Sequence, residues 1–176
     1  MDIYIGSDHG GFKLKEEIKL YIKELGFKVN DLGSAEFDEY DDYSDTAIQL
    51  KQIVVKKSDL RDFRAILICG TGVGMCIASN KIPGVRAALA ASPEVAYFSR
   101  LHNDINVLCL AGLRSSTESI ERVTDGDYQN LIDSGMVTAN INESKRIVKV
   151  FLETETEAVT NTRHRRRLDK IADMEK

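Results

Sequence analysis

Short apolar runs alternate along most of the chain with segments in which apolar residues recur at helical spacing. Five of the runs have the composition of strands, and they cover residues 3–5, 27–32, 65–69, 85–89 and 106–111. The segments between them predict helices over about 14–25, 43–57, 73–81 and 93–101. Because strands and helices alternate, the pattern predicts an α/β fold, a three-layer αβα, Rossmann-like sandwich around a five-stranded parallel sheet.

The third run, at residues 65–69, is apolar on both faces, which is typical of a central parallel strand covered by helices on either side. Right-handed crossovers bring the loops that follow parallel strands to one edge of the sheet, where ligands bind. That edge is expected to carry Asp8 with His9, the glycine-rich run 70–74, and Arg114. His102 precedes a strand, so a single subunit would hold it at the opposite edge.

The pattern changes after Arg114. Residues 115–142 are polar and interrupt the alternation, whereas 143–153 and 160–176 again have helical patterns. A chain of 176 residues suits one compact domain. We therefore predict a single domain over residues 1–176 with an insertion at 115–142.

Composition and charge exclude several classes of protein. No apolar run approaches the roughly 18 residues that a spanning helix needs, so we expect no membrane partner. A net charge of −4 argues against a nucleic-acid partner. The first residues do not form a basic and then apolar leader, and the three cysteines lack the spacing of a zinc site or a disulfide framework. A reducing cytoplasm is the expected location.

The strongest local pattern is Gly-Thr-Gly-Val-Gly at residues 70–74, between a predicted strand and a predicted helix. Glycines allow a tight turn and a close approach to a ligand, and the free N–H groups at a helix start favour an anion. The spacing matches neither the dinucleotide-binding fingerprint nor the P-loop. A tight turn without a ligand is the alternative, but three closely spaced glycines exceed what such a turn requires.

Three further features offer chemistry. Cys69 ends a buried strand beside a helix start, which favours a thiolate base or nucleophile over an inert core cysteine. Asp8 and His9 could move protons or bind sugar hydroxyls, and Asp8 could instead cap a helix. Arg163 and Arg167 are four residues apart and lie on one helix face. Two guanidinium groups placed in this way could clamp a phosphate, although a solvated helix surface has the same pattern.

Taken together, these stretches resemble the type B ribose-5-phosphate isomerase family, which includes the galactose-6-phosphate isomerases. The matching segments are residues 5–12, 66–74, 80–81 and 100–108, and Arg163 and His164 with Arg167. The resemblance implies an aldose–ketose isomerisation through an enediolate, with no metal and no cofactor. Some members of the family have a glutamate at the position of Met75, and its absence here leaves the proton transfer to Cys69.

The resemblance also implies roles for individual residues. Cys69 would move a proton between C1 and C2 with help from Thr71, the N–H groups of residues 70–74 would hold the enediolate oxygen, and His102 would open the furanose ring. The implied substrate-binding residues are Asp8, His9, Tyr43, Gly70, Gly72, Val73, Gly74, Asn103, Arg114, Arg163 and Arg167.

The family places its site across a dimer interface, with His102, Asn103 and Arg114 supplied by the partner and the last helix reaching that partner. We therefore expect a homodimer or homotetramer with shared active sites. The chain departs from the family pattern in two places, both towards the phosphate end of the site. They are residues 115–142, and Asn161-Thr162 where the family has two glycines.

The expected substrate pair is D-ribose 5-phosphate and D-ribulose 5-phosphate. A six-carbon sugar phosphate, such as allose 6-phosphate or galactose 6-phosphate, is the nearest alternative. A sugar-phosphate sensor without catalysis is a second alternative, and the presence of both Cys69 and His102 counts against it. A nucleotide-binding module is a weaker alternative, because no acidic residue after the second strand is placed to bind the ribose of a nucleotide.

Overall fold

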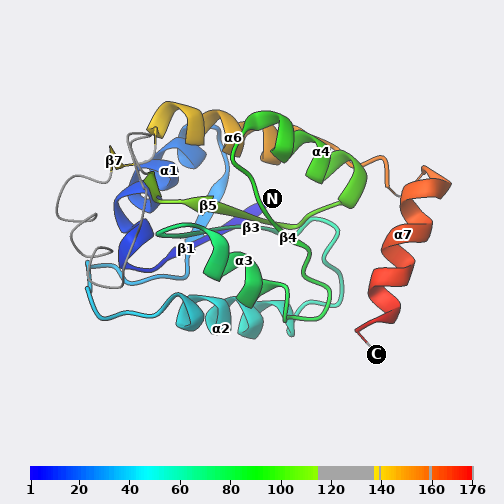
Figure 1. Ribbon diagram of the computed structural model, residues 1–176, viewed down its shortest axis with the longest axis horizontal. Coiled ribbons are helices and arrows are strands. Elements are labelled where there is room, and N and C mark those ends of the chain that lie inside the picture. Colours follow the sequence, from blue (N-terminus) through cyan, green and yellow to red (C-terminus); the bar gives the residue numbers. More distant parts are fainter. Residues whose placement is uncertain (115–136, 139, 159, 176) are drawn as a thin grey trace, which may run out of the picture.

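The computed structural model describes residues 1–114, 137–138, 140–158 and 160–175. In this part of the chain, five parallel strands form one sheet in the order β2-β1-β3-β5-β4 (Figure 1). The strands are β1 (Asp2–Ser7), β2 (Lys28–Asp31), β3 (Arg64–Cys69), β4 (Ala87–Leu89) and β5 (Val107–Ala111). The predicted five-stranded parallel sheet is confirmed.

Helices cover both faces of the sheet and complete the three layers (Figure 1). One face is covered by α1 (Phe12–Glu24), α4 (Pro93–Asn103) and α6 (Ile141–Glu153), and the other by α2 (Tyr43–Val54) and α3 (Val73–Ser79). The last helix, α7 (Thr162–Asp173), lies beyond the end of the sheet that is opposite to the carboxyl ends of the strands. No helix among the described residues is long and apolar enough to cross a bilayer.

The central strand β3 explains how the two cores form. All six of its residues are buried. Because successive side chains in a strand point to opposite faces, Ile66 and Ile68 join the core under α1, α4 and α6, whereas Leu67 and Cys69 join the core under α2 and α3. This alternation places the Cys69 side chain on the same side of the sheet as α3.

The structure differs from the sequence prediction at the fourth strand. That strand was expected over residues 85–89, but β4 contains only Ala87–Leu89. The Arg86 backbone N–H donates to Asn106 Oδ1 (2.8 Å), and the Arg86 guanidinium pairs with Asp104 Oδ2 (2.7 Å). The chain before β4 is therefore held by side-chain contacts to the loop before β5, and regular pairing starts only at Ala87.

Most of the predicted insertion, residues 115–136 and 139, lies outside the described residues. At its borders, β6 (Leu113–Arg114) pairs with β7 (Val137–Thr138) in an antiparallel arrangement that the sequence pattern did not predict. The following helix starts at Ile141, two residues before its expected start, and the Asn140 side chain caps it by accepting a hydrogen bond from the Glu143 N–H.

Candidate functional site

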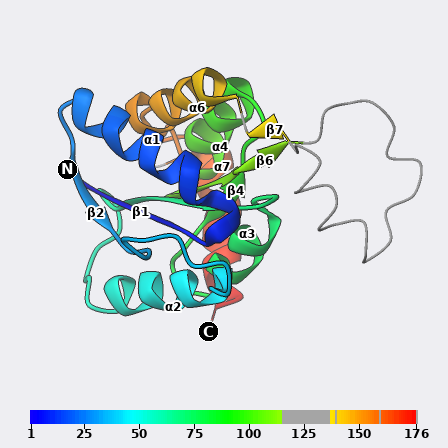
Figure 2. The same ribbon diagram turned by 90° about the vertical axis from the view of Figure 1, so that its left-hand side faces the viewer.

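Three loops meet at the carboxyl edge of the sheet, the edge that faces the viewer in Figure 2. They follow β1, β3 and β5, and their backbones touch at glycines. A Cβ atom on Gly10 would lie 2.8 Å from the Gly70 nitrogen, and one on Gly112 would collide with the Gly10 carbonyl oxygen. Glycine is therefore required where the loops cross, because any larger residue would push them apart.

Gly72 sets the shape of the loop that follows β3. Its φ of 77° lies in the left-handed region, and a Cβ atom there would lie 2.9 Å from the Leu110 carbonyl oxygen. Both the backbone conformation and the space thus require glycine at this position. Gly72 is also the N-cap residue of α3, so the turn directs the chain into that helix.

The Cys69 sulfur lies inside this turn. It accepts a hydrogen bond from the Gly72 N–H at 3.2 Å, and the residue is only 4% exposed. The sulfur therefore faces the loop of glycines and the start of α3, whereas Thr71 and Val73 at the top of the loop are exposed. The thiol is thus brought next to the glycine loop, with the Gly72 N–H in direct contact with the sulfur.

Tyr43, the first residue of α2, lies over the same loop. A Cβ atom on Gly74 would lie 3.0 Å from the Tyr43 ring, so the ring packs directly on the start of α3. The ring is partly open to solvent, with Tyr43 43% exposed. Its hydroxyl-bearing ring therefore borders the loop that holds Cys69.

Asp8 and His9 lie in the loop after β1. The buried Asp8 carboxylate accepts a hydrogen bond from the Gly11 N–H (3.1 Å) and caps the short helix η1 (His9–Gly11), so the capping alternative holds. Burial raises the pKa of Asp8 above its usual value.

His9 has a partner that sequence reasoning missed. One oxygen of Asp41 accepts both the His9 backbone N–H (2.7 Å) and the ring Nδ1 (2.9 Å). Burial alone would lower the pKa of His9, but the hydrogen bond to Asp41 and the charge of Asp8 outweigh it, and the pKa is raised. Since Nδ1 is engaged, Nε2 is the ring nitrogen left for a ligand.

Replacing Asp41 with asparagine is expected to lower the pKa of His9, because the amide removes the charge that stabilises the imidazolium. Since the folded-state pKa is raised, the pair stabilises the fold fully below the unfolded value of about 6.5, and this contribution is lost as the pH rises through the folded-state pKa. NMR titration of the His9 ring measures the shift, with Asp42→Asn as the matched control. An equal His9 pKa in the Asp41 and Asp42 variants would contradict the pairing.

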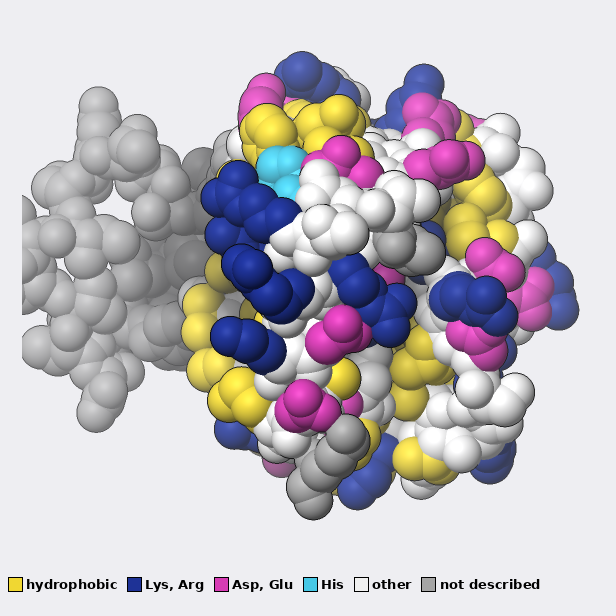
Figure 3. Space-filling view, turned by 90° about the vertical axis from the view of Figure 1, so that its right-hand side faces the viewer, with side chains coloured by type: hydrophobic (Ala, Val, Ile, Leu, Met, Phe, Trp, Pro, Cys, Tyr) yellow, Lys and Arg dark blue, Asp and Glu magenta, His cyan; other side chains and the backbone are white. Residues whose placement is uncertain are grey.

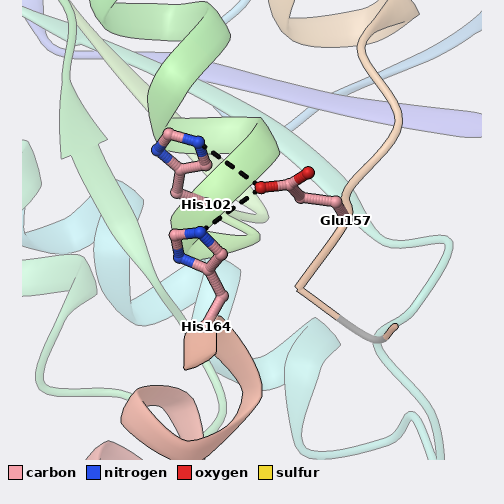
Figure 4. Close-up of side chains that lie close together, drawn as sticks. All are labelled: His102, Glu157 and His164. Carbon is pink, nitrogen blue, oxygen red and sulfur yellow. Dashed lines mark ion pairs between the residues drawn. The ribbon is translucent and has the colours of Figure 1, made fainter. Parts of the chain in front are cut away.

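His102 lies at the opposite edge, in the last turn of α4, as the topology predicted (Figure 4). Its ring stacks on that of His164 from α7, with centroids 4.4 Å apart and planes 5° apart. Glu157, from the segment between α6 and α7, points one carboxylate oxygen at both rings, 3.5 Å from His102 Nε2 and 3.3 Å from His164 Nε2. Sequence reasoning assigned no role to Glu157 or His164.

Buried charges fix the end of α4 that carries His102 and Asn103. Arg100 is only 1% exposed, and its guanidinium pairs with Asp104 Oδ1 (2.7 Å) and donates to the Ile105 carbonyl oxygen (2.6 Å). Asp104 ends the helix with a φ of 45°. A buried, fully paired arginine holds this turn in one conformation, so His102 and Asn103 have a rigid support.

Arg163 and Arg167 are exposed on α7, and His164 between them is turned inward and is 8% exposed. Figure 3 faces the end of the molecule that carries α7, and a band of Lys and Arg side chains runs down it next to a histidine. Burial, together with the nearby charge of His102, lowers the pKa of His164. The His164 ring and the flanking guanidinium groups form the second half of the candidate site.

The predicted site residues thus fall into two groups within one chain. Cys69, Thr71, Tyr43 and the pair Asp8-His9 lie at the carboxyl edge, together with the glycines of residues 70–74. The remaining predicted residues lie at the other end, and they are His102, Asn103, Arg163 and Arg167. Arg114 is placed in β6, just after the carboxyl edge, and its side chain lies outside the described part of the chain.

Among the described residues, two cavities reach the size of typical ligand pockets, roughly 300–1,000 Å³. One, of about 460 Å³, lies beside α1 and Gly112, and the other, of about 580 Å³, lies between α7 and β4 and includes Asn103 in its lining. Cys69 lines neither of them. A smaller cavity of about 150 Å³ lies beside Thr71.

Comparison with known proteins gives consistent matches over the whole chain. A sequence profile described as Ribose/Galactose Isomerase matches residues 3–171. The chain is similar to a probable ribose-5-phosphate isomerase B from Mycoplasma genitalium, with 42% identity over 175 residues that cover 99% of this chain and 96% of the relative.

Solved structures give the same result. A crystal structure of ribose-5-phosphate isomerase B from Mycoplasma genitalium with bound ribulose-5-phosphate matches with a TM-score of 0.77 and 40% identity, covering 99% of this chain and 95% of that chain. A structure of ribose-5-phosphate isomerase B from Clostridium thermocellum matches with a TM-score of 0.76 and 36% identity, covering 99% and 97%.

Proposed function

The chain belongs to the ribose/galactose isomerase family, and we propose that it interconverts D-ribose 5-phosphate and D-ribulose 5-phosphate through an enediolate. The observation that carries this proposal is the similarity to an enzyme structure that holds ribulose-5-phosphate, at 40% identity over 99% of this chain. The Cys69 sulfur within the glycine loop supports the same chemistry, because an isomerase of this kind needs a base beside a site for a negative oxygen.

In the proposed mechanism His102 first opens the furanose ring, taking a proton from the O1 hydroxyl and returning one to the ring oxygen. The Cys69 thiolate then removes the proton on C2 of the open aldose. The electron pair of that C–H bond forms the C1=C2 double bond, and O1 becomes negative. The resulting thiol returns its proton to C1, the O2 proton moves to O1 with the help of Thr71, and C2 becomes the ketone carbon. No electron is gained or lost overall.

The loop at residues 70–74 supplies the stabilisation for the negative oxygen. Backbone N–H groups at fixed positions stabilise a developing charge without having to reorient when the charge appears. The left-handed Gly72 and the close packing of Gly74 under Tyr43 support this role, because both keep the loop in one conformation. Asp8 and His9, in the neighbouring loop, are proposed to bind the hydroxyl groups and the phosphate end of the sugar.

We propose that two subunits form each active site, as expected from the resemblance. The separation of Cys69 and His102 on opposite edges of the sheet supports a shared site, because both groups must reach the same sugar. The partner would supply His102 and Asn103, and a two-fold axis would generate two equivalent sites. The cavities of ligand size described above are not lined by Cys69, which also favours a site completed by a second chain.

A coupled assay that compares sugar phosphates tests the proposed function. We expect the highest kcat/KM for ribose 5-phosphate, with allose 6-phosphate and galactose 6-phosphate as the comparison substrates. A higher kcat/KM for a six-carbon phosphate would replace the proposed substrate. Binding of ribulose 5-phosphate without turnover of any of these sugars would instead indicate a sensor.

Replacing Arg167 with alanine is expected to raise KM for ribose 5-phosphate by about 10- to 100-fold, because a hydrogen bond to a charged group contributes about 1.5–3 kcal/mol. Arg166→Ala, at the neighbouring exposed position of the same helix, is the matched control and should change KM little. Steady-state kinetics with ribose 5-phosphate and with unphosphorylated ribose separate the effects. Equal losses for the two sugars would show that Arg167 does not hold the phosphate.

A further inference from the structure

The cluster formed by His102, Glu157 and His164 has the side-chain types of a transition-metal site. Two imidazole nitrogens and a carboxylate oxygen converge, and the three potential ligand atoms lie within 4.8 Å of one another (Figure 4). Two histidines and one glutamate are a ligand set that zinc takes in proteins, with a fourth position left for water or another ligand.

Two of the three spacings between these atoms are close to those of a metal shell. Glu157 Oε1 lies 3.3 Å from His164 Nε2 and 3.5 Å from His102 Nε2. Charge-assisted hydrogen bonds are shorter, about 2.7–2.9 Å. A tetrahedral ion with bonds of about 2.0–2.1 Å separates neighbouring ligand atoms by roughly 3.3 Å. The carboxylate therefore stands at about the distance from each ring that a shared ion would set.

The three ligands come from three different segments, and the backbone holds those segments together. The Glu157 N–H donates to the Leu101 carbonyl oxygen in α4 (3.1 Å), and the Glu157 carbonyl oxygen accepts from the Asn161 N–H at the start of α7 (2.8 Å). Arg100 Nε also donates to the Thr154 carbonyl oxygen (3.3 Å). The position of Glu157 beside the stacked rings is thus also held by main-chain contacts, and does not depend on the side-chain cluster alone.

We propose that His102, Glu157 and His164 bind a zinc ion or a similar divalent transition metal, and that the bound ion inhibits the isomerase. Inhibition follows because a metal-bound His102 nitrogen cannot accept or donate a proton. This second part rests on the proposed role of His102 in ring opening. The site itself rests only on the three side chains and their spacing.

Two features of the cluster limit its affinity. The rings are stacked within 5°, so one of them must rotate before both nitrogen lone pairs point at a single ion. Arg163 and Arg167 lie on the same helix as His164 and repel a cation. We therefore expect weaker binding than at a structural zinc site, and hence reversible inhibition.

Metal titrations of the intact protein test the site directly. Co²⁺ should produce the visible absorption of a four-coordinate ion, and added Zn²⁺ should remove that absorption by displacement. Glu157→Gln and His164→Asn should each weaken Zn²⁺ binding by at least about 10-fold, because each removes one ligand of three. Glu155→Gln, an exposed neighbour outside the cluster, is the matched control and should bind as the original protein does.

Activity assays, each normalised to the same variant without metal, test the inhibition. Zn²⁺ should inhibit the original protein over its binding range and a chelator should restore the rate, whereas Glu157→Gln should need at least about 10-fold more Zn²⁺. Unchanged Zn²⁺ binding in both ligand variants, or a Co²⁺ spectrum typical of thiolate ligation, would overturn the site and leave the proposed function intact. Binding at the cluster without inhibition would overturn the inhibitory role and would also count against His102 as the ring-opening group.

Discussion

Replacing Cys69 with alanine is expected to lower kcat by about 10²–10⁴-fold, the range over which a positioned acid or base contributes to catalysis. Binding of ribulose 5-phosphate should change little, because the thiol is small and buried and the groups proposed to bind the sugar and its phosphate are other side chains. Steady-state kinetics and calorimetric binding give the two quantities. Exchange of the C2 hydrogen of ribose 5-phosphate with solvent should fall in parallel with kcat, since that exchange requires the base itself.

Cys76 provides the decisive control. It lies one helical turn beyond the glycine loop, and a hydrogen bond with Cys109 lowers the pKa of its thiol to about 6. On acidity alone, Cys76 is therefore a rival for the role of the base. Cys76→Ala should retain most of the activity. Full activity in Cys69→Ala with a large loss in Cys76→Ala would transfer the role to Cys76.

The fold could be predicted because its signals are local. The apolar run that became β3 and the helical spacing of Leu14, Ile18 and Ile22 are visible within short windows of sequence, and all three residues are buried in α1. The boundary of β4 could not be predicted in this way. It depends on Arg86 and Asn106, which are 20 residues apart, and on the conformation of the loop between them.

The candidate site shows the same division between local and long-range information. The glycine loop with Cys69 was found because strand, turn and helix start are neighbours in the sequence. Asp41 was missed because it reaches His9 across 32 residues, and the acidic loop that contains it has many carboxylates that are equally plausible partners. Glu157 was missed for a similar reason, since only the packing of α7 against α4 brings two histidines together beside it.

Replacing His102 with asparagine is expected to lower kcat/KM for ribose 5-phosphate by about 10²–10⁴-fold, because the furanose ring would no longer receive acid–base assistance. A four-carbon aldose 4-phosphate cannot close a furanose ring, because the oxygen that would close it carries the phosphate. Any turnover of that sugar should therefore be nearly the same with and without His102. An equal loss for both substrates would assign His102 to a step other than ring opening.

Mixed dimers then test whether Cys69 and His102 of different subunits share a site. Random pairing of Cys69→Ala chains with His102→Asn chains makes half of the dimers mixed. If sites are shared, each mixed dimer has one intact site of two, so the mixture of inactive parents should regain about one quarter of the original activity. The converse mixture, original chains with chains that carry both substitutions, should also give about one quarter if sites are shared, and about one half if each chain works alone. Because the two edges of the sheet separate these residues within a chain, we expect about one quarter in both mixtures. No recovery in the first mixture together with one half in the second would contradict the shared site.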